Sequence, residues 1–332
     1  MLQSEAQRRT IFKSSLALLL LVLAGCAAKP PESIPDPNPD PQPVPPVVTE
    51  SGTVSPHVAV LLSEPLPAYQ SVSAELVAYL EDYKVYDLSD GSRSSRETFA
   101  AIDESDAELV VAIGLYAAKL AKSFATVPVI FGQVFNVNDN DLISDEIKGV
   151  AALPPLELQA EAWRGMDPNL RNIGAIIGAG HEDLIVEAEQ AMKIHGFKFH
   201  YVVVKSDRET LYQFNRMIPD IDGFLLFPDN RILSSTVLTE ILKIAARHQV
   251  QIAAFSEILL AHGATFSANS VAADIAGKIA IALNEILDGN IDEVADLAPL
   301  SEIRIEVNPA MAQRFGLDLR GVEIGDSVAD AQ

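Results

Sequence analysis

Residues 173–195 read IGAIIGAGHEDLIVEAEQAMKIH, and this stretch decides the fold. Its first six residues form a short apolar run, rich in Ile, that does not alternate with polar residues. Such a run is typical of a parallel strand that is buried on both faces of its sheet. From residue 182 to residue 195 the apolar residues recur at helical spacing. A buried strand followed by an amphipathic helix is half of a βαβ unit, so the stretch predicts an α/β fold.

The same pattern recurs along most of the chain. Six more apolar runs of this kind cover residues 57–62, 109–113, 127–131, 200–204, 223–227 and 251–255. Helical patterns also cover residues 71–80, 234–247 and 271–287. The expected strands form two groups, three before residue 150 and four between residues 172 and 256. We therefore expect two doubly wound, Rossmann-like lobes with parallel sheets.

Small and polar residues follow the ends of these expected strands. In an open parallel sheet, ligands bind just past the carboxyl ends of the strands. This rule selects candidate ligand-binding residues in both groups: Ser63, Glu64, Gly114, Tyr116, Gly132, Gln133, Gly180, Asp229, Asn230 and Ser256. Two lobes that face each other across such ends would form a cleft.

Three of these candidates also have a structural interpretation. Asp229 and Asn230 fit the cap of the helix that is expected to begin near Leu233. Glu64 fits a solvated acid in a loop. The capping role of Asp229 and Asn230 and the loop position of Glu64 therefore stay open as alternatives to ligand binding.

The N-terminus carries the features of an export signal. Arg8, Arg9 and Lys13 precede an apolar segment, residues 15–25, that is too short to span a membrane. The segment ends in Leu-Ala-Gly-Cys at residues 23–26, which resembles the bacterial lipobox. We therefore expect residues 1–25 to be removed and Cys26 to carry acyl chains. Cys26 is the single cysteine of the sequence, so the chain has no internal disulfide.

The region around the expected anchor adds two expectations. A basic stretch at residues 7–13 (QRRTIFK) resembles a twin-arginine signal, and ordinary Sec export fits equally. Residues 26–56 hold half of the chain's 20 prolines and predict an extended tether of on the order of 90 Å. Ala27, in place of Asp, favours the inner leaflet of the outer membrane if the cell is Gram-negative.

Composition excludes several classes of function. The net charge is −22, and removal of the signal deletes three basic groups and one acid, which brings it to about −24. Nucleic-acid binding needs a basic surface, so it is excluded, and membrane contact is expected only through the lipid. The histidines are scattered without metal-ligand spacing, and no Gly-x-Ser-x-Gly elbow exists. We expect a non-enzymatic protein without a cofactor.

Several short blocks, in order, resemble one known family. They are Glu-Pro-Leu-Pro-Ala at 64–68, Pro-Val-Ile-Phe-Gly at 128–132, Gly-Val at 149–150, Phe-Pro-Asp-Asn at 227–230, Phe-Ser-Glu at 255–257, Gly-Ala at 263–264 and Ile-Glu-Val-Asn at 305–308. Together they resemble the substrate-binding proteins of ABC transporters with the type I periplasmic-binding fold, in the branch that binds tryptophan and tyrosine. The resemblance covers about residues 57–318.

The resemblance implies a mechanism and a division of the chain. Residues 57–150 with 268–318 would form lobe 1, residues 151–267 lobe 2, and residues 319–332 a tail. The lobes would close on a small, amino-acid-like ligand and deliver it to an ABC permease. Its carboxylate would meet donors near Ser63, Gly114, Ser256 and Ser267, and its ammonium would meet Glu64 or Asp229.

The chain departs from this family at the expected cleft. An Asp-Pro pair expected after Gly132 is replaced by Val-Phe-Asn-Val-Asn at residues 134–138. A second interpretation therefore stays open. The chain is then an outer-membrane lipoprotein that has kept the binding-protein fold for contact with another envelope protein. In that interpretation Tyr116 or Phe135 would fill the cleft.

Overall fold

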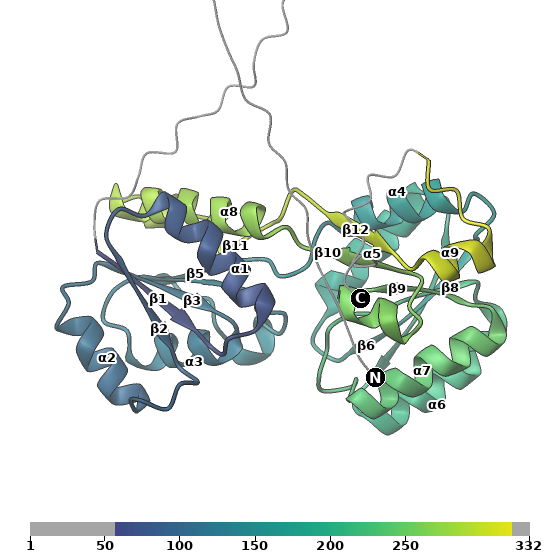
Figure 1. The fold of residues 1–332 in the computed structure, drawn as a ribbon, viewed down its shortest axis with the longest axis horizontal. Helices are drawn as coiled ribbons and strands as arrows, with labels where there is room; N and C mark the ends of the chain where they lie inside the picture. The colour runs from purple at the N-terminus through teal and green to yellow at the C-terminus, as the bar shows by residue number, and fades with distance from the viewer. Residues whose placement is uncertain (1–56, 321–332) are drawn as a thin grey trace, which may run out of the picture. The chain divides into compact units, whose positions relative to one another are not determined.

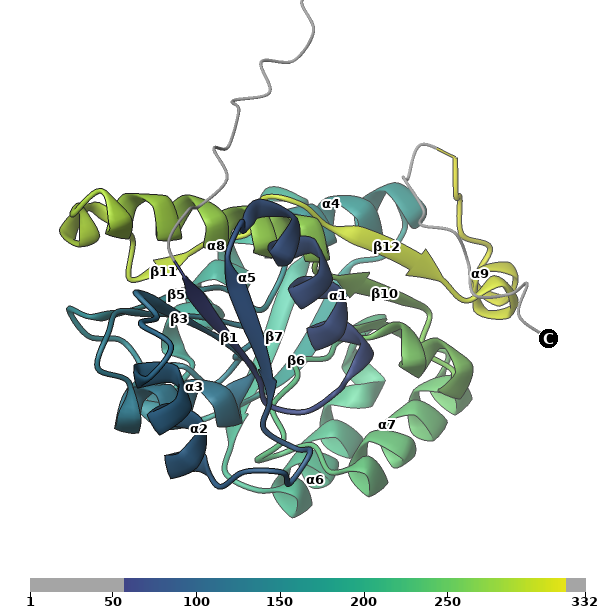
Figure 2. The same ribbon diagram turned by 60° about the vertical axis from the view of Figure 1, so that its left-hand side comes forward.

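The structure is a computed structural model that describes residues 57–320. The expected signal, the tether with Cys26, and residues 321–332 of the expected tail lie outside the described residues. The described chain forms two six-stranded sheets with helices on both faces of each (Figures 1 and 2). The α/β fold with two mostly parallel sheets, expected from the sequence, is confirmed. No helix within residues 57–320 is long and apolar enough to cross a membrane.

The first sheet is parallel throughout. In spatial order it contains β11 (Leu297–Ala298), β5 (Ile147–Val150), β4 (Val129–Gly132), β3 (Leu109–Ile113), β1 (Val58–Leu62) and β2 (Tyr83–Asp87). Every residue of β1, β3, β4 and β5 is buried. The first three are apolar in sequence, while β5 contains Lys148, whose ammonium group pairs with Asp296 at 2.7 Å. The three runs expected before residue 150 are therefore strands β1, β3 and β4.

Helices cover both faces of the first sheet. One face packs against α1 (Pro67–Leu76), η1 (Val77–Tyr79), α8 (Ala272–Leu287) and η5 (Ile291–Glu293), and the other against α2 (Ser95–Asp103) and α3 (Leu115–Phe124). Alternate residues of each strand enter the two cores: Val58 and Val60 face α1 and α8, while Ala59 and Leu61 face α2 and α3. This two-sided burial explains why the strand sequences do not alternate.

The second sheet contains one antiparallel strand. In spatial order it contains β12 (Arg304–Val307), β10 (Phe266–Asn269), β9 (Gln251–Ala254), β8 (Gly223–Leu225), β6 (Asn172–Gly178) and β7 (Lys198–Val204). Only β12 runs antiparallel to its neighbour among these pairs. The run expected at 200–204 forms edge strand β7, where Tyr201 and Val203 are about two-fifths exposed. The expectation that this run is buried on both faces is therefore wrong.

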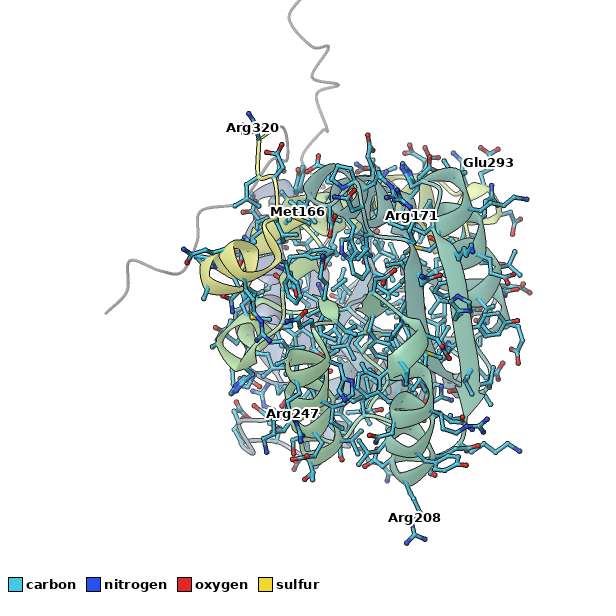
Figure 3. All side chains as sticks on the ribbon, turned by 90° about the vertical axis from the view of Figure 1, so that its right-hand side faces the viewer. Met166, Arg171, Arg208, Arg247, Glu293 and Arg320 are labelled. Carbon is cyan, nitrogen blue, oxygen red and sulfur yellow. The ribbon has the colours of Figure 1, made fainter. Side chains whose placement is uncertain are left out.

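Helices also cover both faces of the second sheet. One face packs against α4 (Leu156–Met166), α5 (Glu182–Ile194) and α9 (Pro309–Phe315). The other packs against α6 (Asp207–Met217), η3 (Ile218–Asp220), α7 (Ser235–His248) and η4 (Glu257–His262). Figure 3 shows this lobe with all its side chains, and Arg208 points from α6 away from the body.

Trp163, the single tryptophan of the sequence, anchors the core under α4. Its indole Nε1 donates to Oε1 of Gln251 at 2.8 Å, and its ring meets that of Phe266 edge-on at 5.2 Å. A Cβ at Gly223 would lie 2.5 Å from the indole, so β8 needs a glycine there. Because Trp163 is fully buried in the second lobe, its fluorescence reports unfolding of that lobe.

Three segments connect the lobes: residues 151–155, 270–271 and 299–303. Gln159 secures the first by donating from Nε2 to the carbonyl oxygen of Pro154 at 3.1 Å. Asp274 at the start of α8 secures the third by accepting the backbone N–H of Ser301 at 2.7 Å and its hydroxyl at 2.9 Å. We call these three segments the hinge.

The third hinge segment corrects one expected boundary. We expected residues 268–318 to return to the first lobe. Helix α8 and strand β11 do so, whereas β12 pairs with β10 in the second sheet and α9 packs on that sheet. The physical reason is that β10 would otherwise leave an unpaired edge over the buried side chains of Phe266 and Ala268.

Candidate functional site

In the first lobe, the residues at the strand ends mainly serve their own lobe. Ser63 is buried, and its Oγ accepts the backbone N–H of Ala117 at 2.9 Å, in the first turn of α3. Gly114 begins that helix with φ +91°, and a Cβ there would lie 2.6 Å from Ser63 Oγ and 2.7 Å from the Tyr69 ring. Tyr69 therefore occupies the space above Gly114 where we expected the ligand carboxylate.

Glu64 and Tyr116 lie on the surface of the first lobe. Glu64 is exposed, as the loop interpretation expected. Burial, followed by the negative charge of Glu64, raises the pKa of Tyr69. Tyr116 is half exposed, and its hydroxyl lies 3.4 Å from Oγ of Ser95 on α2. Tyr116 is therefore directed along its own lobe and does not fill a cleft.

The loop after β4 reaches the second lobe. Gln133, next to Gly132, has φ +59°, which turns the chain sharply out of the strand. Two residues after Gln133, the centroid of the Phe135 ring lies 4.7 Å from that of the His181 ring. Asn136 is buried, and its Oδ1 lies 2.9 Å from Nε2 of His181. Phe135, and not Tyr116, is thus the aromatic residue that contacts the opposite lobe.

In the second lobe, Asp229 is fully engaged by its own neighbours. The carboxylate is 1% exposed, and Arg231 donates to it from Nε at 2.8 Å, from Nη2 at 2.6 Å and from its backbone N–H at 3.0 Å. His181 Nε2 lies 3.6 Å from it. Burial raises the pKa of Asp229, but the hydrogen bonds from Arg231 and His181 outweigh that effect and leave it well below its usual range.

The same arginine also joins the two lobes. Nη1 of Arg231 donates to the carboxylate of Asp139, in η2 (Asn138–Asn140), and at 3.1 Å to the carbonyl oxygen of Ala179. Gly180 has φ +92°, and a Cβ there would lie 2.7 Å from Oδ1 of Asp139, so glycine permits this approach. We call Asn136, Asp139, His181, Asp229 and Arg231 the inter-lobe cluster.

The remaining expected residues lie outside this cluster. Asn230 is exposed, Ser256 is half-buried, and the buried hydroxyl of Ser267 accepts from Asn269 at 3.0 Å. Neither Asp229 nor Asn230 caps α7, because Ser234 is its N-cap and accepts the N–H of Val237. The capping interpretation of Asp229 and Asn230 is therefore wrong.

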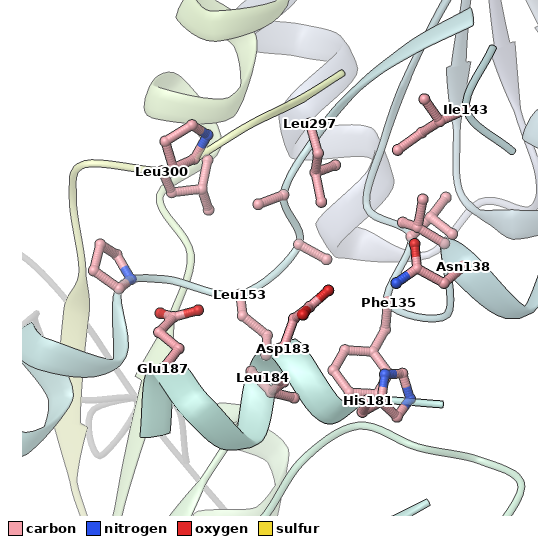
Figure 4. A pocket seen from close by; sticks show the side chains of 16 residues that line it. Phe135, Asn138, Ile143, Leu153, His181, Asp183, Leu184, Glu187, Leu297 and Leu300 are labelled. Atoms are coloured by element: carbon pink, nitrogen blue, oxygen red, sulfur yellow. The ribbon is translucent and has the colours of Figure 1, made fainter. Parts of the chain in front are cut away.

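Beside the cluster lies a cavity of about 440 Å³. Its wall comes from four segments: the loop after β4, the first hinge segment, the start of α5, and the chain from β11 into the third hinge segment. Most of the wall is apolar, as with Phe135, Leu153, Leu184, Leu297 and Leu300 (Figure 4). We call it the hinge cavity. Its size is within the range of small-molecule sites.

The expected site residues lie in some of the loops that form the inter-lobe cluster and the hinge cavity, but most of the side chains that meet there are different ones. Asp139, Arg231, Asp183 and the hinge residues were not among the expected site residues. One signal was present, the Asp229-x-Arg231 spacing after a strand, which allows a side-chain pair within one turn. Among residues 57–320, no group of three or more His, Cys, Asp and Glu side chains is arranged to hold a metal ion.

The profile of the family described as ABC transporter substrate binding protein matches residues 79–324. The chain belongs to that family. This confirms the resemblance seen in the sequence. Proteins of this family are a solute-binding class that works outside the cytoplasm. A comparison with curated proteins gives no match for this substrate-binding protein.

Solved structures share the fold at low sequence identity. A ligand-free, open substrate binding protein with adhesive properties from Clostridium difficile is 16% identical, with TM-score 0.63 over 82% of this chain and 99% of its own. An ABC domain in complex with L-Trp from Streptococcus pneumonia is 18% identical, with TM-score 0.58 over 83% and 100%. A conserved domain protein from Vibrio cholerae is 16% identical, with TM-score 0.56 over 82% and 100%. These likenesses show the type I periplasmic-binding fold of the substrate-binding protein.

Proposed function

We propose that this substrate-binding protein is a lipid-anchored receptor outside the cytoplasm that holds a small, amino-acid-like solute between its lobes for an ABC permease. One observation carries the proposal: the hinge cavity takes its wall from both lobes and from two hinge segments. A solute in the hinge cavity would contact segments of both lobes, and these segments approach each other when the lobes close. Differential contact of this kind is what lets a ligand shift a protein towards its closed state.

The ligand test uses the full chain, purified in detergent. A solute at about 100 times its Kd adds about 2.7 kcal/mol to the free energy of unfolding. For a body of this size that corresponds to a rise of roughly 5 °C or more in Tm. Trp163 fluorescence during heating is the measurement, against a panel of amino acids and related solutes. A panel in which no member raises Tm would overturn solute binding.

The anchor is supported by the Leu-Ala-Gly-Cys sequence at residues 23–26. Cells fed a radiolabelled fatty acid should incorporate label into the wild-type chain and none into Cys26→Ser. The substituted chain should leave the membrane fraction, because more than one acyl chain is needed for stable anchoring and nothing replaces them. Equal labelling of the two chains would contradict the anchor.

A second function, contact with an envelope protein, is favoured by the inter-lobe cluster. Arg231 bridges Asp229 of the second lobe and Asp139 of the first, so the lobes have a direct connection through their own side chains. Small-angle scattering separates the two functions. A transport receptor becomes more compact when a panel solute binds, whereas an interaction protein held by its own cluster gives the same curve with and without every solute.

A further inference from the structure

The hinge cavity carries negative charge without a counter-charge. Asp183 and Glu187, both on α5, belong to its wall, and the lining residues include no lysine or arginine. Figure 4 shows the carboxylate of Asp183 pointing into the space between Leu153, Leu297 and Phe135. Both side chains are exposed to solvent, and within residues 57–320 neither carboxylate takes part in a hydrogen bond or ion pair.

The two acids together do not stabilise α5, because they repel each other. Asp183 lies in the first turn, where a negative charge suits the helix dipole. Glu187 lies a full turn further on, where that benefit has faded. Like charges four residues apart on a helix repel each other. A positive group that reaches both carboxylates relieves this repulsion.

We infer that the hinge cavity selects an amine that lacks a carboxylate, with its ammonium group at Asp183 and Glu187 and its apolar body among the leucines. This inference rests on the proposed function and specifies the class of solute. The rings of Phe135 and His181, whose centroids lie 4.7 Å apart, belong to the same wall, and a Phe ring face attracts a cation.

The same charges disfavour the parent amino acid. An α-carboxylate would be a third negative charge in the cavity, and no cationic side chain lines the wall to receive it. Arg231, the cation of the neighbouring cluster, is already engaged by Asp229 and Asp139. An ionised group that enters an apolar site without a partner loses its hydration without compensation.

Matched pairs of solutes test the inference directly. Tryptamine and tryptophan, or tyramine and tyrosine, differ only in the carboxylate. Isothermal titration of the full chain should show the amine binding at least about tenfold more tightly than its amino acid, because the α-carboxylate would lose hydration in the cavity without a cationic partner. Equal affinity, or tighter binding of the amino acid, would overturn the inference and leave solute binding intact.

Charge-neutral variants locate the site. Asp183→Asn and Glu187→Gln should each weaken amine binding by about tenfold. Glu189→Gln is the matched control: it removes one negative charge from the same helix, but Glu189 lies outside the hinge cavity, so it should bind the amine as the wild type does. Unchanged Tm values would show that all three variants fold.

The outcomes separate the two proposals. Loss of affinity in the two cavity variants alone supports the inference. Amine binding that none of the variants changes overturns the site. If another member of the solute panel binds and no amine does, the inference fails while the proposed function stands. If no solute binds, both fail.

Discussion

Arg231 and Asp229 lie two residues apart and form a two-pronged ion pair, from Nε to Oδ1 at 2.8 Å and from Nη2 to Oδ2 at 2.6 Å. Arg320 and Asp318 form the same arrangement at the same spacing, with both contacts at 2.9 Å. The difference is burial, because Asp229 is 1% exposed and Asp318 is 42% exposed. The chain thus contains two Asp-x-Arg ion pairs with the same geometry, one with a buried carboxylate and one with an exposed carboxylate.

Arg231→Ala should lower the free energy of unfolding by about 3 kcal/mol, because it leaves a buried carboxylate without its partner. This is the lower end for a buried pair, since the guanidinium is one-third exposed. Urea unfolding followed by Trp163 fluorescence measures it. Arg320→Ala is the control, and it should leave the urea midpoint unchanged because exposed pairs contribute little. Equal effects of the two substitutions would contradict the role of burial.

Asp139→Asn should loosen the connection between the lobes while each lobe stays folded. Asp139 is the partner of Arg231 from the opposite lobe, and the neutral amide loses the ion pair. Small-angle scattering should then show a larger radius of gyration without ligand. Asp141→Asn is the control in the same loop, because Asp141 pairs with Lys122 inside the first lobe at 3.0 Å. Identical scattering from Asp139→Asn and the wild type would show that the Asp139–Arg231 ion pair does not hold the lobes together.

Gly114→Ala should lower the free energy of unfolding by about 3 kcal/mol, because strain at positive φ adds to an overpacked Cβ. The new Cβ would meet Ser63 and Tyr69 at less than 3 Å. Gly91→Ala separates the two effects, since Gly91 has φ +66° and nothing lies within 4 Å of its Cβ position. That variant should lose only about 1 kcal/mol. Equal losses in urea unfolding would show that contact with Tyr69 has no effect.

Glu306 should give the protein a pH dependence that a neutral side chain lacks. Burial, followed by the charge of Glu257, raises its pKa, and Arg304 opposes this. Its Oε2 is buried and has no hydrogen-bond partner in the described chain. The folded state therefore holds the proton more tightly than the unfolded state, whose pKa is about 4.3. Stability from this group is present below that pH and is lost as pH rises through the raised pKa.

The measurement compares the wild type with Glu306→Gln at pH 4, 5, 6 and 7. The wild type should lose unfolding free energy relative to the variant across this range. Glu302→Gln, an exposed neighbour, should keep a constant difference from the wild type. A constant difference for Glu306→Gln would show that its carboxyl titrates normally in the folded state.

The apolar runs that were predicted as strands are mostly those that the fold buries on both faces, and edge strand β7 is the exception. The short buried strands β5 and β10 were not predicted, because Lys148 interrupts the apolar sequence of the first and Ser267 and Asn269 that of the second. Runs such as 173–178 contain little but apolar residues, because both faces of β6 are covered. Strand β2 was missed because it lies at the edge of its sheet, and its sequence Tyr-Lys-Val-Tyr-Asp is mostly exposed. Strand β11 is two residues long, and no sequence pattern can develop over that length.

The sequence pointed to some of the loops that carry the inter-lobe cluster but not to the side-chain pairs within the cluster. The rule that ligands lie past the ends of parallel strands selected Gly180, which approaches Asp139 of the opposite lobe, and Asp229, which holds the arginine that reaches Asp139. It could not show that Arg231 would reach Asp139, because the two are 92 residues apart and meet only when both lobes have formed. The hinge cavity depends on side chains from four segments, and no single stretch of sequence carries its signature.

Strands β11 and β12 carry a consequence for how the molecule is built. Synthesis delivers a chain from its amino end, and these strands, Leu297–Ala298 and Arg304–Val307, complete the first and second sheets respectively. A nascent chain that stops before residue 297 therefore presents the open edges of β5 and β10, and open edges favour aggregation. Both sheets thus receive their last described strand from one short segment, residues 297–307, after all their other strands have been made.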